Sequence, residues 1–221
     1  MTKSEVKVSR LSADERRNQI LQVAIKLFSR KGFSGTTTKE IAQAAGVSEA
    51  IIFKHFATKS DLYNAILDYK CCEAGIEQAF SFLDEAIDSK SDYEIFYELT
   101  LNAISHHEKD PEFLRLLILS GLEGHEFSEI FVRRKIEPLY EILSNYISQR
   151  QKEGVFRSDI NPRLIIRAFF GMITHHAMNK LLWDFQQRIL KVSDEEAARA
   201  FSEILLSGIK RNQEEKSNAK S

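Results

Sequence analysis

The sequence has little that would interrupt a helix or span a membrane. Its 221 residues include only three prolines and nine glycines, the two residues that disfavour helix interiors most. It also lacks long alternating runs of β-branched residues, which are typical of strands. No stretch approaches the roughly 18 consecutive apolar residues that a membrane-spanning helix needs. These absences predict an all-α chain without a membrane span.

Cysteine is also scarce. Cys71 and Cys72 are the only two, and their adjacency strains a disulfide between them and provides no ligand set for zinc. The first ten residues lack the apolar core of a signal peptide. We therefore expect a cytoplasmic protein with reduced thiols. A redox-sensing role for the pair is the open alternative.

The most informative stretch present is residues 36–56, TTTKEIAQAAGVSEAIIFKHF. Thr37 and Glu40 are spaced for a capping box, which predicts a helix from Thr38. Gly46 ends that helix, because glycine adopts the left-handed backbone of a sharp turn at no steric cost. Ser48 is spaced as the N-cap of a second, seven-residue helix. The pattern predicts a helix-turn-helix, although ordinary bundle helices can be joined in the same way.

Helical spacing divides this stretch into buried and exposed positions. We expect the first helix to bury Ile41, Ala44 and Ala45 and the second to bury Ile52 and Phe56. The outward positions of the second helix are then Ala50, Ile51, Phe53, Lys54 and His55.

The spacing of these residues resembles the DNA-binding signature of the TetR family of bacterial transcriptional regulators. The residues that carry the resemblance are Thr36-Thr37-Thr38, Ile41-Ala42, Ala45-Gly46-Val47-Ser48, Ala50, Ile52-Phe53, His55-Phe56, Lys59 and Leu62. The resemblance implies a three-helix DNA-binding domain followed by a helical domain that binds ligands and forms a homodimer. A weaker similarity at 154–162 extends it toward the C-terminus.

Charge is distributed unevenly. Residues 1–70 hold 12 lysines and arginines against 7 acidic residues, a net +5, whereas residues 71–221 hold 19 against 25, a net −6. A basic N-terminal third with an acidic remainder suits phosphate binding at one end only. Chance clustering is the alternative.

We divide the chain into four parts. Residues 1–11 are a basic arm expected to be flexible, and 12–58 are the helix-turn-helix domain. Residues 59–210 are the ligand-binding and dimerisation domain, and 211–221 are a tail expected to be disordered because it has no apolar face. Further helix starts are predicted at Ser12, Thr58, Asp110-Pro111, Asn161-Pro162 and Ser193.

In the C-terminal part, one proline and two glycines bear on how the predicted helices run and pack. Pro138 predicts a kink or a break in the helical run from Glu126 to Lys152. The helix from Pro162 to about Phe185 and the one after Ser193 carry Gly171 and Gly208, which permit close helix approach. The resemblance implies that these two helices form a four-helix bundle across a two-fold axis. Alternatively, they only close the core of one chain.

The resemblance also implies which residues contact double-stranded DNA, in the form of a palindromic operator. Backbone contacts are expected at Thr36, Thr38, Ser48, Phe53 and Lys59, base contacts at Glu49, Ala50, Ile51 and Lys54, and either role at Lys39 and His55. Phe53 stands where the family commonly has tyrosine, so it lacks the phenolic hydroxyl that could bind a phosphate.

A small-molecule effector is expected in the helical domain, because a bundle of this size commonly keeps an apolar pocket with a few polar groups. By the resemblance we expect its lining at Phe96, Leu99, Asn102, Phe113, Leu117, Phe169, Ile173 and His176.

No motif indicates a cofactor, a metal or an enzyme. The adjacent pairs His106-His107 and His175-His176 project about 100° apart on a helix and share an ion poorly. The sequence contains no catalytic signature. We expect a DNA-binding regulator, a repressor released by a small, largely apolar ligand. The alternatives are a TetR-like activator, a helical ligand-binding or scaffold protein that has lost DNA binding, and an enzyme on a helical scaffold.

Overall fold

The structure is a computed structural model that describes residues 11–73 and 91–211. The predicted arm at 1–11 and tail at 211–221 fall almost wholly outside the described residues, as do the side chains of Cys71 and Cys72. Apart from one antiparallel bridge between Phe156 and Lys210, the described elements are helices. The predicted all-α class is therefore confirmed. None of the described helices is long and apolar enough to cross a membrane.

The described residues form two compact units. One contains residues 11–73 together with Glu112–Ser128, and the other contains residues 91–111 and 129–211. The first unit is thus discontinuous in sequence, since a segment from the middle of the chain packs with the N-terminal helices. The domain boundary expected between residues 58 and 59 stays a prediction.

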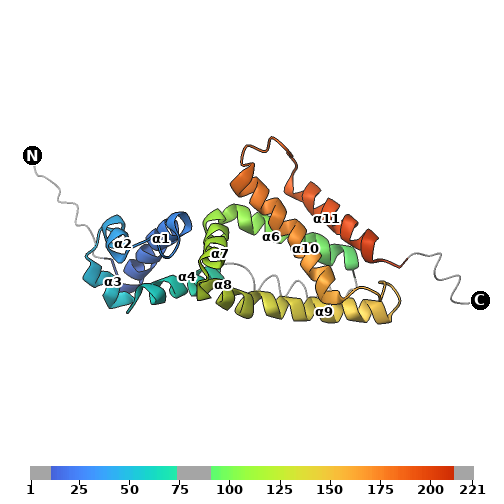
Figure 1. Cartoon of the computed structure of the whole chain (residues 1–221), viewed down its shortest axis with the longest axis horizontal. Coiled ribbons are helices and arrows are strands. Elements are labelled where there is room, and N and C mark those ends of the chain that lie inside the picture. Colours follow the sequence, from blue (N-terminus) through green and yellow to red (C-terminus); the bar gives the residue numbers. More distant parts are fainter. Residues whose placement is uncertain (1–10, 74–90, 212–221) are drawn as a thin grey trace, which may run out of the picture. The chain divides into compact units, whose positions relative to one another are not determined.

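The helices of the first unit, labelled in Figure 1, surround a small apolar core. Its elements are α1 (Ala13–Lys31), α2 (Thr38–Ala45), α3 (Glu49–His55), α4 (Lys59–Glu73), α7 (Pro111–Glu123) from Glu112 onward, and the start of α8 (Glu126–Phe131). α1 packs against α2 and α4, and α2 packs against α3. The core includes Ile20, Phe28, Ile41, Ile52, Phe56, Leu62 and Ile66, each at most 3% exposed.

Local capping explains where these helices begin. Ser12 opens α1 and Thr37 opens α2, each through a capping box, as predicted. Before α4 the Thr58 hydroxyl accepts from the Asp61 amide at 3.0 Å, and the Asp61 carboxylate accepts from the Thr58 amide at 2.9 Å. Each pair satisfies backbone N–H groups that a helix start leaves without partners.

The helices of the second unit surround a core of their own. They are α6 (Asp92–Lys109), η1 (Val132–Ile136), α9 (Glu137–Lys152), α10 (Pro162–Met178), η2 (Asn179–Trp183) and α11 (Asp194–Ile209). α6 packs along α11, while α10 contacts α6, α9 and α11. Their shared core includes Ile95, Phe96, Leu143, Ile147, Phe156, Ile166, Phe169 and Ile173.

Of the kink or break predicted at Pro138, the structure shows no break. The preceding residues Val132–Ile136 form one π-helical turn, and α9 begins at Glu137 with proline in its first turn. In an unbroken α-helix the proline ring would clash with the carbonyl of Arg134, four residues earlier. The wider turn removes that clash. α10 shows a related departure, because its α-helical part ends at Met178 and the last predicted turn is the π-helix η2.

Candidate nucleic-acid interface

The turn between α2 and α3 depends on Gly46. Its backbone is left-handed, with φ 65° and ψ 33°, and the next amide, that of Val47, donates to the Ala42 carbonyl at 3.0 Å. A side chain would strain this conformation. Ala42 and Ala45 are buried on α2, whereas Ala44 is exposed. The expectation for Ala44 was therefore wrong, because the buried face of α2 turns toward Ala42.

α3 is held by its apolar side and exposes the other. Ile52 and Phe56 are 1% and 3% exposed, as predicted. On the opposite side Ala50, Phe53 and Lys54 are exposed, and Phe53 is 46% exposed despite its ring. The intervening Ile51 and His55 are half-buried. A short helix that presents a methyl group, an aromatic ring and a cation can enter a DNA groove.

Ser48 precedes α3 in the extended conformation of an N-cap, with φ −79° and ψ 153°. Its hydroxyl makes no capping hydrogen bond, so the prediction is correct for the backbone and wrong for the side chain. Ser48 is exposed. Its hydroxyl therefore remains available to a phosphate oxygen.

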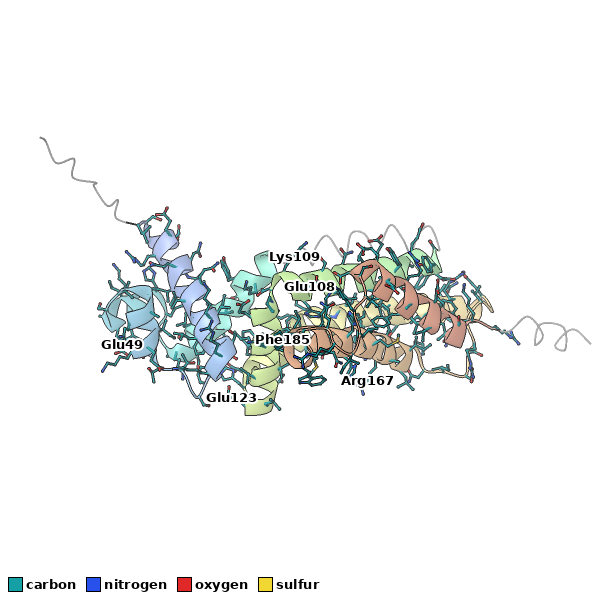
Figure 2. The ribbon with its side chains drawn as sticks, turned by 90° about the horizontal axis from the view of Figure 1, so that it is seen from above. Glu49, Glu108, Lys109, Glu123, Arg167 and Phe185 are labelled. Carbon is teal, nitrogen blue, oxygen red and sulfur yellow. The ribbon has the colours of Figure 1, made fainter. Side chains whose placement is uncertain are left out.

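Two threonines before α3 use their hydroxyls within the protein. Thr36 is fully buried and donates to the Gly32 carbonyl at 2.8 Å. Thr38 donates to the carboxylate of Glu49, the first residue of α3 and labelled in Figure 2. The first bond stabilises the turn before α2, and the second joins the starts of α2 and α3.

The cations of this surface differ in their surroundings. Lys39 on α2 and Lys54 on α3 are exposed. Lys59, at the start of α4, is half-buried, with its ammonium nitrogen 4.2 Å from the centroid of the Phe33 ring. Desolvation by burial lowers the pKa of Lys59, and Glu123 and Glu40 oppose that shift. Lys59 is thus held in place by an aromatic ring, a favourable cation–π contact.

The sequence did not predict two contacts of charged side chains, one cation–π contact and one salt bridge. Arg17 on α1 places its guanidinium 5.0 Å from the centre of the Phe56 ring, at the end of α3. Lys31 pairs with Glu40 at 2.8 Å, and this contact, ahead of the hydrogen bonds from Thr37, lowers the pKa of Glu40 to about 2. Only the spacing of Glu40 from Thr37 was visible in the sequence.

Glu123, which lies far from the helix-turn-helix in the sequence, also supports the interface. Its carboxylate accepts hydrogen bonds from the amides of Phe33 at 2.8 Å and Ser34 at 3.1 Å. Figure 2 labels it at the end of α7. His125 packs beside it, with its ring centroid 4.3 Å from that of Phe33 and 4.7 Å from that of Tyr63. We call Glu123, its two amide partners and His125 the α7 clamp.

The residues expected to bind a ligand divide between the units. Phe113 and Leu117 belong to the first unit, and the other six belong to the second. Four of those six lie in one core cluster: Phe96, Leu99, Phe169 and Ile173. The ring centroid of His176 is 5.5 Å from that of Phe201. Asn102 is exposed on α6. As a set they stay a prediction.

Comparison with known proteins supports the DNA-binding interpretation. Residues 20–66 match the family described as bacterial regulatory proteins, tetR family. A nucleoid occlusion factor, SlmA of Vibrio vulnificus, is 30% identical over 145 residues, which cover 64% of this chain and 69% of SlmA. The chain belongs to the tetR family of bacterial regulatory proteins. It is a DNA-binding regulator, and α2 and α3 are its helix-turn-helix.

Two further matches extend over most of this TetR-family chain. The transcriptional repressor NicS of Pseudomonas putida is 27% identical over 150 residues, covering 67% of this chain and 69% of NicS. The crystal structure of FadR from Bacillus subtilis in complex with stearoyl-CoA has a TM-score of 0.65 at 19% identity and covers 87% of this chain and 98% of FadR. The second match shows that the fold extends beyond the helix-turn-helix.

Proposed function

We propose that the protein is a homodimeric repressor that acts in the cytoplasm, without a catalytic step, and leaves its palindromic operator when a small, largely apolar ligand binds. The observation that carries the proposal is the outward side of α3, where Ala50, Phe53 and Lys54 are exposed while Ile52 and Phe56 anchor the helix. A helix that only packs in a bundle and binds no partner gains nothing from exposing a phenylalanine.

In the proposed DNA complex, two kinds of contact share this surface. Ser48, Lys39 and Lys59 contact phosphates, and Phe53 packs on a sugar. Ala50, Ile51 and Lys54 face base edges, with His55 beside them. Thr38 and Glu49 fix α3 relative to α2, and Glu49 can still accept from a cytosine amino group. Thr36 makes no contact with DNA in this complex, because its buried hydroxyl donates to a carbonyl inside the protein.

The dimer is proposed to form through α10 and α11. Leu164 on α10 and Ile204 on α11 are 58% and 61% exposed, which is costly for apolar side chains in a lone chain. A Cβ atom built on Gly171 or Gly208 would meet no heavy atom within 4 Å apart from adjacent residues and the backbone of its own helix, so both outward surfaces are open to a close helix neighbour. To bind successive major grooves, such a dimer must present its two α3 helices about 34–36 Å apart.

Ligand release is proposed to act through α7. This helix carries Phe113 and Leu117, two of the expected ligand contacts, and ends at Glu123 of the α7 clamp. A ligand that prefers a shifted α7 would alter the support of Phe33 and, through Lys59 over that ring, the start of α4. The ligand shifts the population away from the DNA-binding form by its difference in affinity for the two forms.

The test is to select DNA fragments bound by the purified protein and then add candidate ligands. Molecules that co-purify with the protein come first, followed by acyl thioesters, since the similar FadR structure holds stearoyl-CoA. We expect one class to release the DNA at a concentration that saturates the protein. A protein that binds its operator but is insensitive to every bound molecule would contradict the ligand part of the proposal alone.

A second function is favoured by one comparison. The Vibrio relative is named as a nucleoid occlusion factor rather than a transcriptional regulator. A DNA-binding role without transcriptional control therefore competes with repression. A reporter gene behind the selected operator separates the two, and it also distinguishes a repressor from an activator.

A further inference from the structure

The segment between η2 and α11 exposes an unusual amount of apolar surface. Phe185 is 71% exposed, Ile189 84% and Leu190 58%, and Trp183 at the end of η2 is 61% exposed. We call residues 183–190 the apolar loop. Large apolar side chains that cluster on a surface mark an interaction site more often than chance exposure does.

The apolar loop is held in shape rather than loosely attached. The carboxylate of Asp184 accepts from the amides of Arg188 at 2.9 Å and Ile189 at 2.8 Å, and its own amide donates to the Asn179 carbonyl at 2.7 Å. Gln187 has a positive φ of 50°, uncommon for a residue with a side chain. A loop already fixed in one conformation loses little entropy when it binds.

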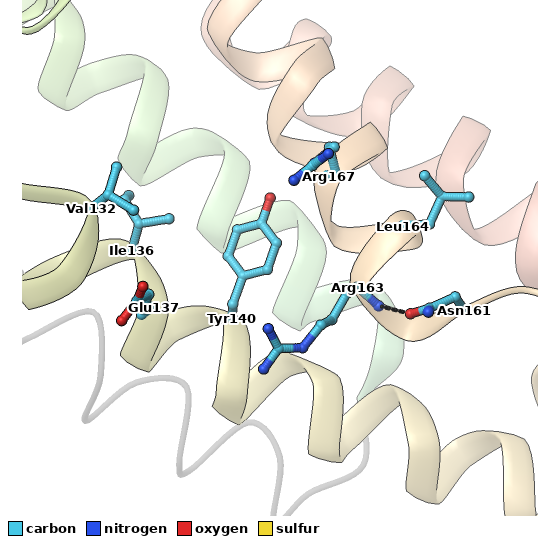
Figure 3. A pocket seen from close by; sticks show the side chains of 8 residues that line it. All are labelled: Val132, Ile136, Glu137, Tyr140, Asn161, Arg163, Leu164 and Arg167. Atoms are coloured by element: carbon cyan, nitrogen blue, oxygen red, sulfur yellow. Dashed lines mark hydrogen bonds between the residues drawn. The ribbon is translucent and has the colours of Figure 1, made fainter. Parts of the chain in front are cut away.

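A groove of about 560 Å³ lies elsewhere in the same unit, between the start of α9 and the start of α10 (Figure 3). Its apolar lining comes from Val132, Ile136, Tyr140 and Leu164. Val132 is 44% exposed and Leu164 58%. Its polar lining comes from two arginines, Arg163 and Arg167, together with Glu137 and Asn161. An apolar segment carrying aromatic side chains would fit this surface.

Among the described residues the two arginines are engaged differently. Arg163 pairs with the exposed carboxylate of Glu141, whereas Arg167 makes no hydrogen bond or ion pair there. Figure 2 labels Arg167 on α10 and Phe185 in the apolar loop. An exposed guanidinium beside an apolar groove is suited to stack on an aromatic ring.

We propose that the apolar loop of one protomer occupies the groove of its partner. The inference rests on the proposed dimer, and it follows from two-fold symmetry. α10 has 17 residues, with Gly171 near its middle. Rotation by 180° about an axis that passes Gly171 at right angles to α10 brings the C-terminal end of one α10 beside the N-terminal end of the other. The apolar loop follows the first end, and the groove lies at the second.

The exchange would bury both sets of exposed apolar side chains. The partner's Phe185 lies against Leu164 and under the Arg167 guanidinium, while the partner's Ile189 covers Val132. The contact occurs twice in each dimer, because a two-fold interface uses the same surfaces in both directions. It extends the interface of α10 and α11 at both of its ends.

The experiment is a cysteine cross-link in the full chain, with Cys71→Ser and Cys72→Ser to remove the native thiols. Leu164→Cys and Phe185→Cys are combined in one chain and oxidised. The two positions flank most of α10, about 20 Å apart by helix rise alone, so they cannot join within one protomer. We expect disulfide-linked dimers from the double variant and none from either single variant.

A second measurement covers the case in which oxidation fails. Phe185→Ser with Ile189→Ser should weaken dimer association at least about tenfold in sedimentation equilibrium, since two apolar side chains per protomer lose their burial. Lys191→Ala, just beyond the loop, is the matched control and should leave association unchanged.

The outcomes separate the two proposals. If the wild-type chain is dimeric but the double cysteine variant does not link and the serine variant associates normally, the loop exchange is wrong while the dimer stands. If the wild-type chain is monomeric, both are wrong.

Discussion

At the residue scale, the two exposed lysines of the interface should have different effects. Lys39→Ala removes a proposed phosphate contact, so it should weaken binding to all sequences by a similar factor and reduce the salt slope by about 1 per protomer. Lys54→Ala removes a proposed base contact and should change the preference among operator variants, by about 1–3 kcal/mol at the affected base pair. Fluorescence anisotropy at several salt concentrations measures both effects.

Lys152→Ala, an exposed change on α9 in the second unit, controls for the loss of one positive charge. If Lys54→Ala weakened every sequence equally, the base contact assigned to it would be wrong.

His107 should make stability depend on pH. Burial, reinforced by the charge of His106 and opposed by Asp110, lowers its pKa to about 4, whereas an unfolded histidine titrates near 6.5. Between these values the unfolded chain takes up a proton that the folded chain does not. The contribution of His107 to stability should therefore fall as pH drops from about 6.5 to about 4 and level off below.

The measurement for His107 is urea unfolding at pH 7.5, 6 and 5, with His107→Gln as the comparison. The variant should lose less stability than wild type over this range. Equal losses would show that His107 titrates normally in the folded chain.

The sequence predicted those residues whose partners are near in the chain. Thr37 and Glu40 are three residues apart, so their capping box was visible, as was the need for glycine at 46. The burial of Thr36 and the missing cap bond of Ser48 were not visible, because tertiary packing sets both. Glu123 binds an amide 90 residues away, and no local pattern marks such a partner.

At the element scale, α7 connects expected ligand contacts to the helix-turn-helix. Glu123→Ala removes the acceptor for the amides of Phe33 and Ser34, and it removes one carboxylate whose charge acts on Lys59, but Glu123 is not itself a proposed DNA contact. We expect operator binding to persist while release by ligand becomes at least about fivefold weaker, the size of a typical coupling free energy. The measurement is the ratio of operator affinities with and without saturating ligand.

Glu112→Ala, in the first turn of the same helix, is the matched control and should leave that ratio unchanged. An unchanged ratio for Glu123→Ala would instead show that the α7 clamp has only a structural role.

Helix identity was predictable at this scale, but irregular turns were not. The helix starts at Pro111 and Pro162 are correct, since proline after a capping side chain is a local signal. Pro138 was expected to kink or break its helix; there is no break, and a π-helical turn precedes the proline. A proline excludes a regular α-helix at its position without specifying how the chain adapts.

At the scale of the whole molecule, the distribution of charge is consistent with DNA binding by the N-terminal part and dimerisation by the C-terminal part. The helix-turn-helix lies in the basic N-terminal third, and the proposed dimer helices lie in the acidic remainder. The acidic part disfavours contacts with DNA away from the interface. The discontinuity of the first unit was not predictable, because it depends on α7 packing with residues far earlier in the chain.

The most direct test of the central claim is the binding of the purified full-length chain to a selected palindromic fragment across a series of salt concentrations. We predict two protomers per site and an affinity that falls steeply and linearly with the logarithm of the salt concentration. A monomer that binds no fragment even at low ionic strength would contradict the claim.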